Sequence, residues 1–228
     1  MEQNEFAYGR FFKAARFGFR MIRRRVHTPE AADFAAPAVY IGHHQNLKGP
    51  FNVMLWINVP IRLWVLSVFT NGEKCRRQLE DYTFKTHYPL PKPLAWFLAN
   101  VAGAVYPKLM RSLGAIEVYR KDEAVQAIKT FRASTEALCR GERVLIFPDM
   151  DNESDDYEMG EIYKGFLYLE KHFHTKTGRH LPFIPIHYND KKRRIKLGSP
   201  IMFGDGDMDD QIGGISAMLV NSVNKLAL

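Results

Sequence analysis

The chain has 228 residues, 46% of them hydrophobic, which is the size and composition of one larger α/β domain with a substantial core. Its only two cysteines, Cys75 and Cys139, exclude a disulfide framework and a Cys-rich metal site, and they favour a reducing cytosol. The formal net charge of +7 favours anionic partners: phosphate groups, a nucleotide-bearing cofactor, an acidic carrier protein, anionic lipid or nucleic acid. Charge alone does not choose among them. The longest apolar stretch, residues 94–106, is shorter than the roughly 20 residues that span a bilayer. We therefore expect a cytoplasmic protein that is peripheral on the cytoplasmic face of a membrane.

Residues 1–30 are predicted to form a basic amphipathic helix that precedes the main domain. Apolar residues recur at helical spacing and share one face, while cations form a separate stripe. Such a helix suits either a membrane surface or packing on the domain. The apolar face consists of Tyr8, Phe12, Ala15, Phe19, Ile22 and Val26, and the stripe of Lys13, Arg16, Arg20 and Arg23.

Residues 31–228 alternate between apolar strands and helical segments. This alternation predicts an α/β fold: a single-domain sandwich with a largely parallel central sheet flanked by helices. The helix at 94–113 is expected to break near Pro107. The expected strands are 37–42, 61–70, 115–120, 143–149, 181–188 and 194–203, and the expected helices are 49–58, 73–81, 94–113, 122–141, 162–173 and a C-terminal one from 208.

Two adjacent histidines, His43 and His44, follow the first predicted strand, where loops of α/β folds carry chemistry. A histidine that acts as a base usually needs a carboxylate to fix its tautomer and orientation. No Asp or Glu occurs from Phe34 to Gly72, so any such carboxylate must come from elsewhere in the chain.

Four segments in register resemble the glycerophospholipid acyltransferase superfamily, to which the lysophosphatidate acyltransferases belong. The family's first motif is Asn-His, four residues, then Asp; here His44 takes the place of the histidine and Gly49 that of the aspartate. The other segments resemble the family's Gly-x-Ile-x-Val-x-Arg block, its Phe-Pro-Glu-Gly turn and its Pro-rich closing strands. In this sequence they read HHQNLKGP (43–50), LGAIEVYRKDE (113–123), VLIFPDMDNE (144–153), and LPFIPIHY (181–188) with IKLGSPI (195–201).

The resemblance implies transfer of a fatty acyl chain from acyl-CoA or acyl carrier protein to the hydroxyl of a glycerol-phosphate-type lysolipid. His44 is expected to be the general base. Asp149 is the first substitute for the missing aspartate, with Asp151 and Glu153 behind it; a backbone carbonyl or water could also orient the ring. Backbone N–H groups at the start of the helix after Gly49 could meet negative charge. The expected substrate-binding residues are Arg120 as a phosphate clamp, Lys48, Gln45, Asn46, Phe147 and Pro148.

No cofactor and no metal are expected beyond the acyl donor as co-substrate. The expected partners are the lysolipid, the acyl donor and a membrane surface reached through the N-terminal helix, with no nucleic acid. The alternative is a catalytically diverged lipid- or membrane-binding protein on the same fold, which the glycine at position 49 favours.

Overall fold

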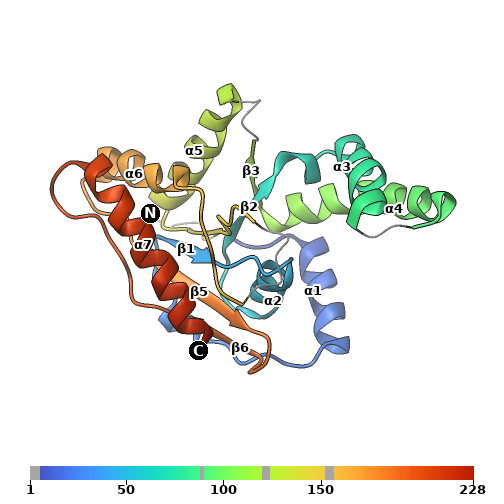
Figure 1. Cartoon of the computed structure of the whole chain (residues 1–228), viewed down its shortest axis with the longest axis horizontal. Coiled ribbons are helices and arrows are strands. Elements are labelled where there is room, and N and C mark those ends of the chain that lie inside the picture. The colour runs from blue at the N-terminus through green and yellow to red at the C-terminus, as the bar shows by residue number, and fades with distance from the viewer. Residues whose placement is uncertain (1–5, 88–89, 120–123, 152–156) are drawn as a thin grey trace. The chain divides into compact units, whose positions relative to one another are not determined.

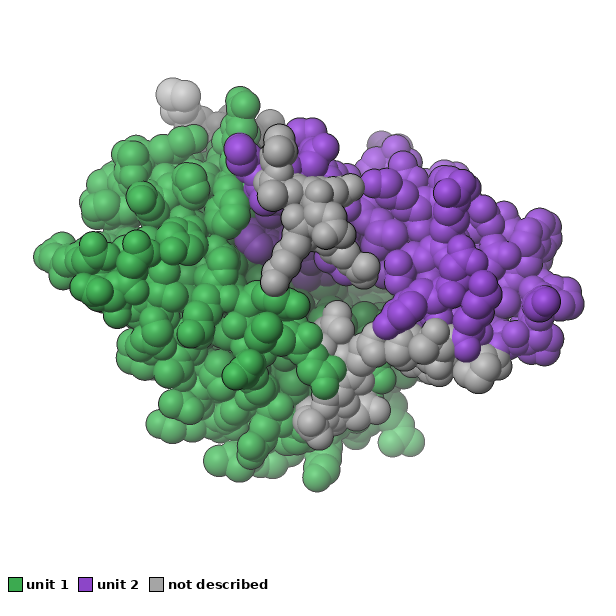
Figure 2. All heavy atoms as spheres, turned by 45° about the horizontal axis from the view of Figure 1, so that its top comes forward, with its two compact units in different colours: residues 1–6, 16–62, 131–228 green, residues 7–15, 63–130 purple. Residues whose placement is uncertain are grey.

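The computed structural model describes residues 6–87, 90–119, 124–151 and 157–228, and these form the predicted α/β fold with largely parallel strands (Figure 1). Two compact units divide the chain (Figure 2). The first unit contains Met1–Phe6, Arg16–Arg62 and Phe131–Leu228, and the second contains Ala7–Ala15 and Leu63–Thr130.

The first unit contains four neighbouring strands in the order β4-β1-β5-β6. β4, β1 and β5 are parallel, and β6 runs antiparallel to β5. Every residue of β1 and β5 is buried, as expected where both faces of a parallel sheet are covered. The strands are β1 (Ala38–Gly42), β4 (Arg143–Ile146), β5 (Phe183–Asn189) and β6 (Arg194–Leu197).

Helix α7 packs along β5 and also contacts β1 (Figure 1). Its end is tied to β5 by Asn189, whose side-chain amide donates to the carbonyl of Ala227 at 2.7 Å. Helix α6 begins later than predicted, because a 3-10 turn, Gly165–Tyr168, occupies the start of the expected helix. The helices of this unit are α2 (Lys48–Trp56), α6 (Leu169–Thr177), α7 (Met208–Ala227) and the part of α5 (Ala124–Cys139) that follows Thr130.

The second unit is a parallel strand pair with a helical insertion between its strands. Helices α3 and α4 pack on one another around a small core of Cys75, Leu79 and Ala99. The expected break near Pro107 is wrong: α4 runs through the proline, whose missing N–H removes one hydrogen bond but whose ring is buried within a long helix. The elements are β2 (Arg62–Leu66), α3 (Gly72–Gln78), a π-helical segment (Leu79–His87), α4 (Lys92–Leu113) and β3 (Ile116–Val118).

The predicted N-terminal helix is present as α1 (Arg10–Ile22), and two of its cations bind backbone oxygens. Arg16 and Arg20 donate to carbonyls at the end of α2, with both Nε atoms on the Leu55 oxygen at 2.9 and 2.7 Å. The last carbonyls of a helix have no partners within it and carry its partial negative charge, so arginine is suited to this position. Burial lowers the pKa of Arg20 from its usual value. This part of the cationic stripe therefore supports the fold.

The apolar residues of α1 divide between the core and solvent. Tyr8 and Phe12 are buried, as their face predicted, whereas Phe17, Met21 and Ile22 are each more than two thirds exposed. Among the helices of the described residues, none combines the length and the apolar character needed to cross a bilayer.

Candidate functional site

The histidine pair and Asp149 meet at one edge of the sheet in the first unit. β1 and β4 are parallel neighbours, with Ile41 opposite Ile146, so their carboxyl ends lie side by side. His43 follows β1 directly, and Asp149 follows β4 after Phe147 and Pro148. In open α/β sheets this edge is where ligands usually bind.

The Asp149 carboxylate holds both histidines, through different groups. Its Oδ1 accepts a hydrogen bond from Nδ1 of the His43 ring, and both residues are almost fully buried. Its Oδ2 accepts from the backbone N–H of His44 at 2.9 Å. A carboxylate at Nδ1 fixes the proton on that nitrogen and leaves the lone pair of the neutral ring on Nε2. The geometry therefore gives His43 the arrangement of a base supported by an acid.

The ring of His44 is held in the other tautomer. Its Nδ1 accepts a hydrogen bond from the backbone N–H of Leu47 at 3.2 Å, so the neutral ring carries its proton on Nε2. The edge of Phe147 approaches this ring with the centroids 6.1 Å apart. Asp149 was expected to orient the ring of His44. Its ring contact is with His43 instead, and its contact with His44 is to the backbone.

The loop after His44 turns through three consecutive left-handed residues. Gln45, Asn46 and Leu47 have φ values of 47°, 47° and 70°, and α2 begins at the next residue. Its first N–H groups bond within the turn: Lys48 donates to the Gln45 carbonyl at 3.0 Å and Gly49 to the His44 carbonyl at 3.1 Å. These two N–H groups therefore already have backbone partners, and the N–H of Phe51, which follows Pro50, donates to the Leu47 carbonyl at 3.1 Å.

Position 49 has no room for a side chain. A Cβ built on Gly49 would lie 2.1 Å from the backbone oxygen of His43. The loop therefore crosses closely over itself, and an aspartate at this place in the motif is excluded by sterics. The carboxylate that contacts the histidine pair comes from Asp149 at the end of β4.

A third histidine, His187 on β5, lies beside the pair and was not identified from the sequence. Its ring is nearly parallel to that of His43, with the centroids 6.5 Å apart. The Gln45 amide nitrogen lies 3.4 Å from its Nε2, and its buried Nδ1 has no hydrogen-bond partner among the described residues. A buried polar nitrogen of this kind is usually paired with a water or a ligand. In the sequence, the feature that could have identified His187 is its position within an otherwise apolar predicted strand.

Burial keeps His187 neutral at physiological pH. Burial first, and the neighbouring His43 and Lys196 after it, lower the pKa of this ring to about 4. The site therefore combines a carboxylate-bound imidazole with a second imidazole that resists protonation.

The other residues predicted for the site lie partly in the histidine loop and partly after β4, and some fall outside the described residues. Lys48 is exposed at the start of α2, and Asn46 and Phe147 are partly exposed. Pro148 is buried, and its carbonyl accepts from the Tyr163 N–H at 2.9 Å. Asp151 is exposed two residues beyond Asp149. Arg120 and Glu153 lie outside the described residues.

Comparisons with known proteins add no assignment: no protein-family model matches the sequence, and no curated protein is significantly similar to it.

Restoring the motif aspartate should damage the loop. Gly49→Asp and Gly49→Ala each place a Cβ on the His43 oxygen, and we expect a loss of about 1–3 kcal/mol or more in the free energy of unfolding, measured in urea. Gly160→Ala is the control, because a Cβ there meets nothing within 4 Å. Equal free energies of unfolding for Gly49→Ala and Gly160→Ala would contradict the close contact between Gly49 and the His43 carbonyl.

His187 should make the fold sensitive to acid. Its pKa of about 4 in the folded state lies below the ordinary 6.5, so the unfolded chain binds a proton first as the pH falls. Its stabilising contribution is complete above pH 6.5 and is lost as the pH falls toward 4. Between pH 7 and pH 5 we expect the wild type to lose about 2 kcal/mol more than His187→Gln in urea unfolding. Parallel pH profiles for the two proteins would exclude this role.

Proposed function

We propose that the protein is an acyltransferase that moves a fatty acyl chain from acyl-CoA or acyl carrier protein to the hydroxyl of a glycerol-phosphate-type lysolipid. The observation that carries the proposal is the buried hydrogen bond between His43 and Asp149 at the carboxyl ends of β1 and β4. It joins two of the segments that resemble the glycerophospholipid acyltransferases, and it provides the histidine–carboxylate pair that Gly49 seemed to remove from the first motif.

In this proposal His43 is the general base. Its Nε2 takes the proton of the acceptor hydroxyl while the hydroxyl oxygen attacks the thioester carbonyl. The carbon–sulfur bond then breaks, and the thiolate takes the proton from the imidazolium, so that the products are an ester and a free thiol. Asp149 stabilises the imidazolium that forms between these steps. The assignment moves the base from His44, which the sequence analysis favoured, to the ring that Asp149 contacts.

His44 is suited to a different role in the same reaction. Because its Nδ1 accepts from Leu47, the neutral ring offers an N–H at Nε2. A donor at a partly exposed position is suited to bind the oxyanion that develops on the thioester carbonyl. Arg120 would bind the lysolipid phosphate, as the resemblance implies. Lys48, beside the histidine pair in the sequence, is a second candidate cation for a phosphate or for the diphosphate of the acyl donor.

The alternative is a protein that binds lipid on this fold without turnover. The burial of His43, which is 4% exposed, favours it, since a base must come within hydrogen-bonding distance of the substrate hydroxyl. Thiol release from acyl-CoA or acyl carrier protein in the presence of lysophospholipids distinguishes the two functions, because a binder releases no thiol.

Asp149→Asn should lower kcat by about 10²–10⁴, because an amide can no longer fix the His43 tautomer or stabilise the imidazolium. Asp210→Asn, at an exposed position on α7, is the control and should retain full turnover. Thiol release by the purified full chain measures both. Full turnover of Asp149→Asn would remove this carboxylate from the mechanism.

The pH profile separates the two histidines. His43→Gln should abolish the acidic limb of kcat/KM, which reports the base, whereas His44→Gln should lower the rate and keep that limb. Loss of the limb in His44→Gln alone would return the base to His44.

Membrane association is the second part of the proposal, and exposed apolar residues support it. Phe17, Met21 and Ile22 are exposed on α1. Helix α4 contains no Asp or Glu and exposes Trp96 and Phe97, which are 56% and 57% accessible. Cations flank its apolar part, with Lys92 at one end and Lys108 and Arg111 toward the other. Exposed aromatic side chains between cations are typical of surfaces that bind anionic bilayers.

Replacing both aromatic residues with glutamate, in Trp96→Glu/Phe97→Glu, should weaken binding to vesicles of phosphatidylglycerol and phosphatidylcholine by roughly tenfold or more, because their burial in lipid is lost. The matched control is Ile128→Glu/Met218→Glu, which changes two exposed apolar residues on other helices. Vesicle flotation measures the bound fraction. Equal flotation of the two double variants would exclude α4 as a membrane-binding surface.

A further inference from the structure

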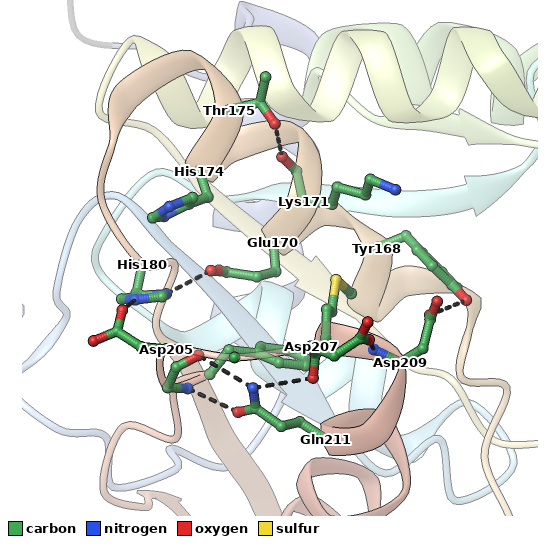
Figure 3. Close-up of a pocket in the computed structure, with 14 residues that line it drawn as sticks. Tyr168, Glu170, Lys171, His174, Thr175, His180, Asp205, Asp207, Asp209 and Gln211 are labelled. Atoms are coloured by element: carbon green, nitrogen blue, oxygen red, sulfur yellow. Dashed lines mark hydrogen bonds and ion pairs between the residues drawn. The ribbon is translucent and has the colours of Figure 1, made fainter.

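A second cluster of polar side chains surrounds α6 and has no part in the proposed acyl transfer. It lines a pocket of about 370 Å³ between α6 and the segment that leads into α7 (Figure 3). Glu170, His174 and His180 each present one ligand atom there, and these atoms lie within 4.8 Å of one another. No metal site was predicted from the sequence.

Glu170 is the fixed member of the cluster. It is 4% exposed, and its Oε2 accepts from the backbone N–H of Leu181 at 2.8 Å. This bond directs Oε1 toward His180, whose Nδ1 lies 2.7 Å away (Figure 3). The carboxylate is therefore oriented by the backbone before any ion binds.

The two histidines approach the same carboxylate from different segments. His174 lies one helical turn after Glu170 on α6, so the two side chains share a face. Its ring stacks on that of His180 with the centroids 4.7 Å apart. Asp205 lies on the other side of His180, with its Oδ1 3.6 Å from Nε2. A histidine that binds a metal through one nitrogen commonly has a carboxylate at the other, which fixes its orientation.

We propose that Glu170, His174 and His180 bind a divalent transition-metal ion of the zinc type, with Asp205 orienting His180. Two imidazoles and one carboxylate are ligands that zinc accepts, whereas Ca²⁺ and Mg²⁺ prefer oxygen alone. Tetrahedral zinc with ligands at 2.0–2.1 Å separates them by roughly 3.4 Å, so the cluster must contract. The exposed side chain of His174 can make that movement while Glu170 stays in place.

The ion would join segments that are distant in sequence. It would connect α6 to the residues that precede β5 and, through Asp205, to the loop that precedes α7. If the ion binds the folded chain and not the unfolded chain, it raises the free energy of unfolding by an amount set by the metal concentration and the Kd.

The test uses the full chain with Co²⁺ and Zn²⁺ alone as probes. Wild-type protein should give the visible absorption of four-coordinate Co²⁺ and should compete with a chromophoric chelator for Zn²⁺. His174→Ala should lose the Co²⁺ absorption and bind Zn²⁺ about tenfold or more weakly. His172→Ala, which removes an exposed histidine of the same helix outside the cluster, should match the wild type.

A second substitution tests the site by the gain of a signal, which a misfolded variant would not give. His174→Cys should add a thiolate-to-cobalt charge-transfer band, which His172→Cys should not. Absence of Co²⁺ absorption in the wild type, or equal Zn²⁺ affinity of His174→Ala and His172→Ala, would overturn the proposal and leave Glu170 and His180 as an ion pair. None of these measurements depends on acyl transfer, so their outcome is separate from that of the proposed function.

Discussion

The rest of the candidate site depends on the two hydrogen bonds that the Asp149 carboxylate accepts. One oxygen fixes the ring of His43 and the other fixes the backbone of His44. Because the carboxylate is buried, both of its oxygens need donors, and the two histidines supply them at one point. With the backbone of His44 held, its carbonyl can accept from the N–H of Gly49, and this bond closes the turn that leads into α2. One residue at the end of β4 thus determines the shape of a loop that follows β1.

The sheet topology explains why Asp149, which follows β4, reaches the loop that follows β1. Parallel neighbouring strands bring their carboxyl ends to the same edge of a sheet, so a residue after β4 reaches the loop after β1 without any insertion. Within the loop itself, the left-handed run from Gln45 to Leu47 brings Gly49 against the carbonyl of His43. The compact turn and an aspartate at position 49 are therefore incompatible. The carboxylate that pairs with His43 comes from the end of the adjacent strand, β4.

Much of this arrangement could be predicted from the sequence. The alternation of apolar strands and helices predicted the α/β fold. Asp149 was identified because it stands at the acid position of the segment that resembles the Phe-Pro-Glu-Gly turn. The choice between His43 and His44 could not be predicted, because adjacent residues leaving a strand point to opposite sides and a one-residue difference decides which ring meets the acid. His187 was missed because it is distant in sequence from the histidine pair, and only the position of β5 in the sheet brings its ring beside His43.

The N-terminal helix also contributes to the support of this site. Its predicted cationic stripe suggested a surface for lipid, yet Arg16 and Arg20 use their guanidinium groups on the carbonyls that end α2. The other end of α2 is the turn that carries the histidine loop. A nine-residue helix is thus held at one end by Asp149 through the loop and at the other by α1. Those arginines already have backbone partners. In the proposed membrane association, attraction of α1 to anionic lipid would therefore depend on its other cations, and the exposed Phe17 and Met21 would supply the apolar contact.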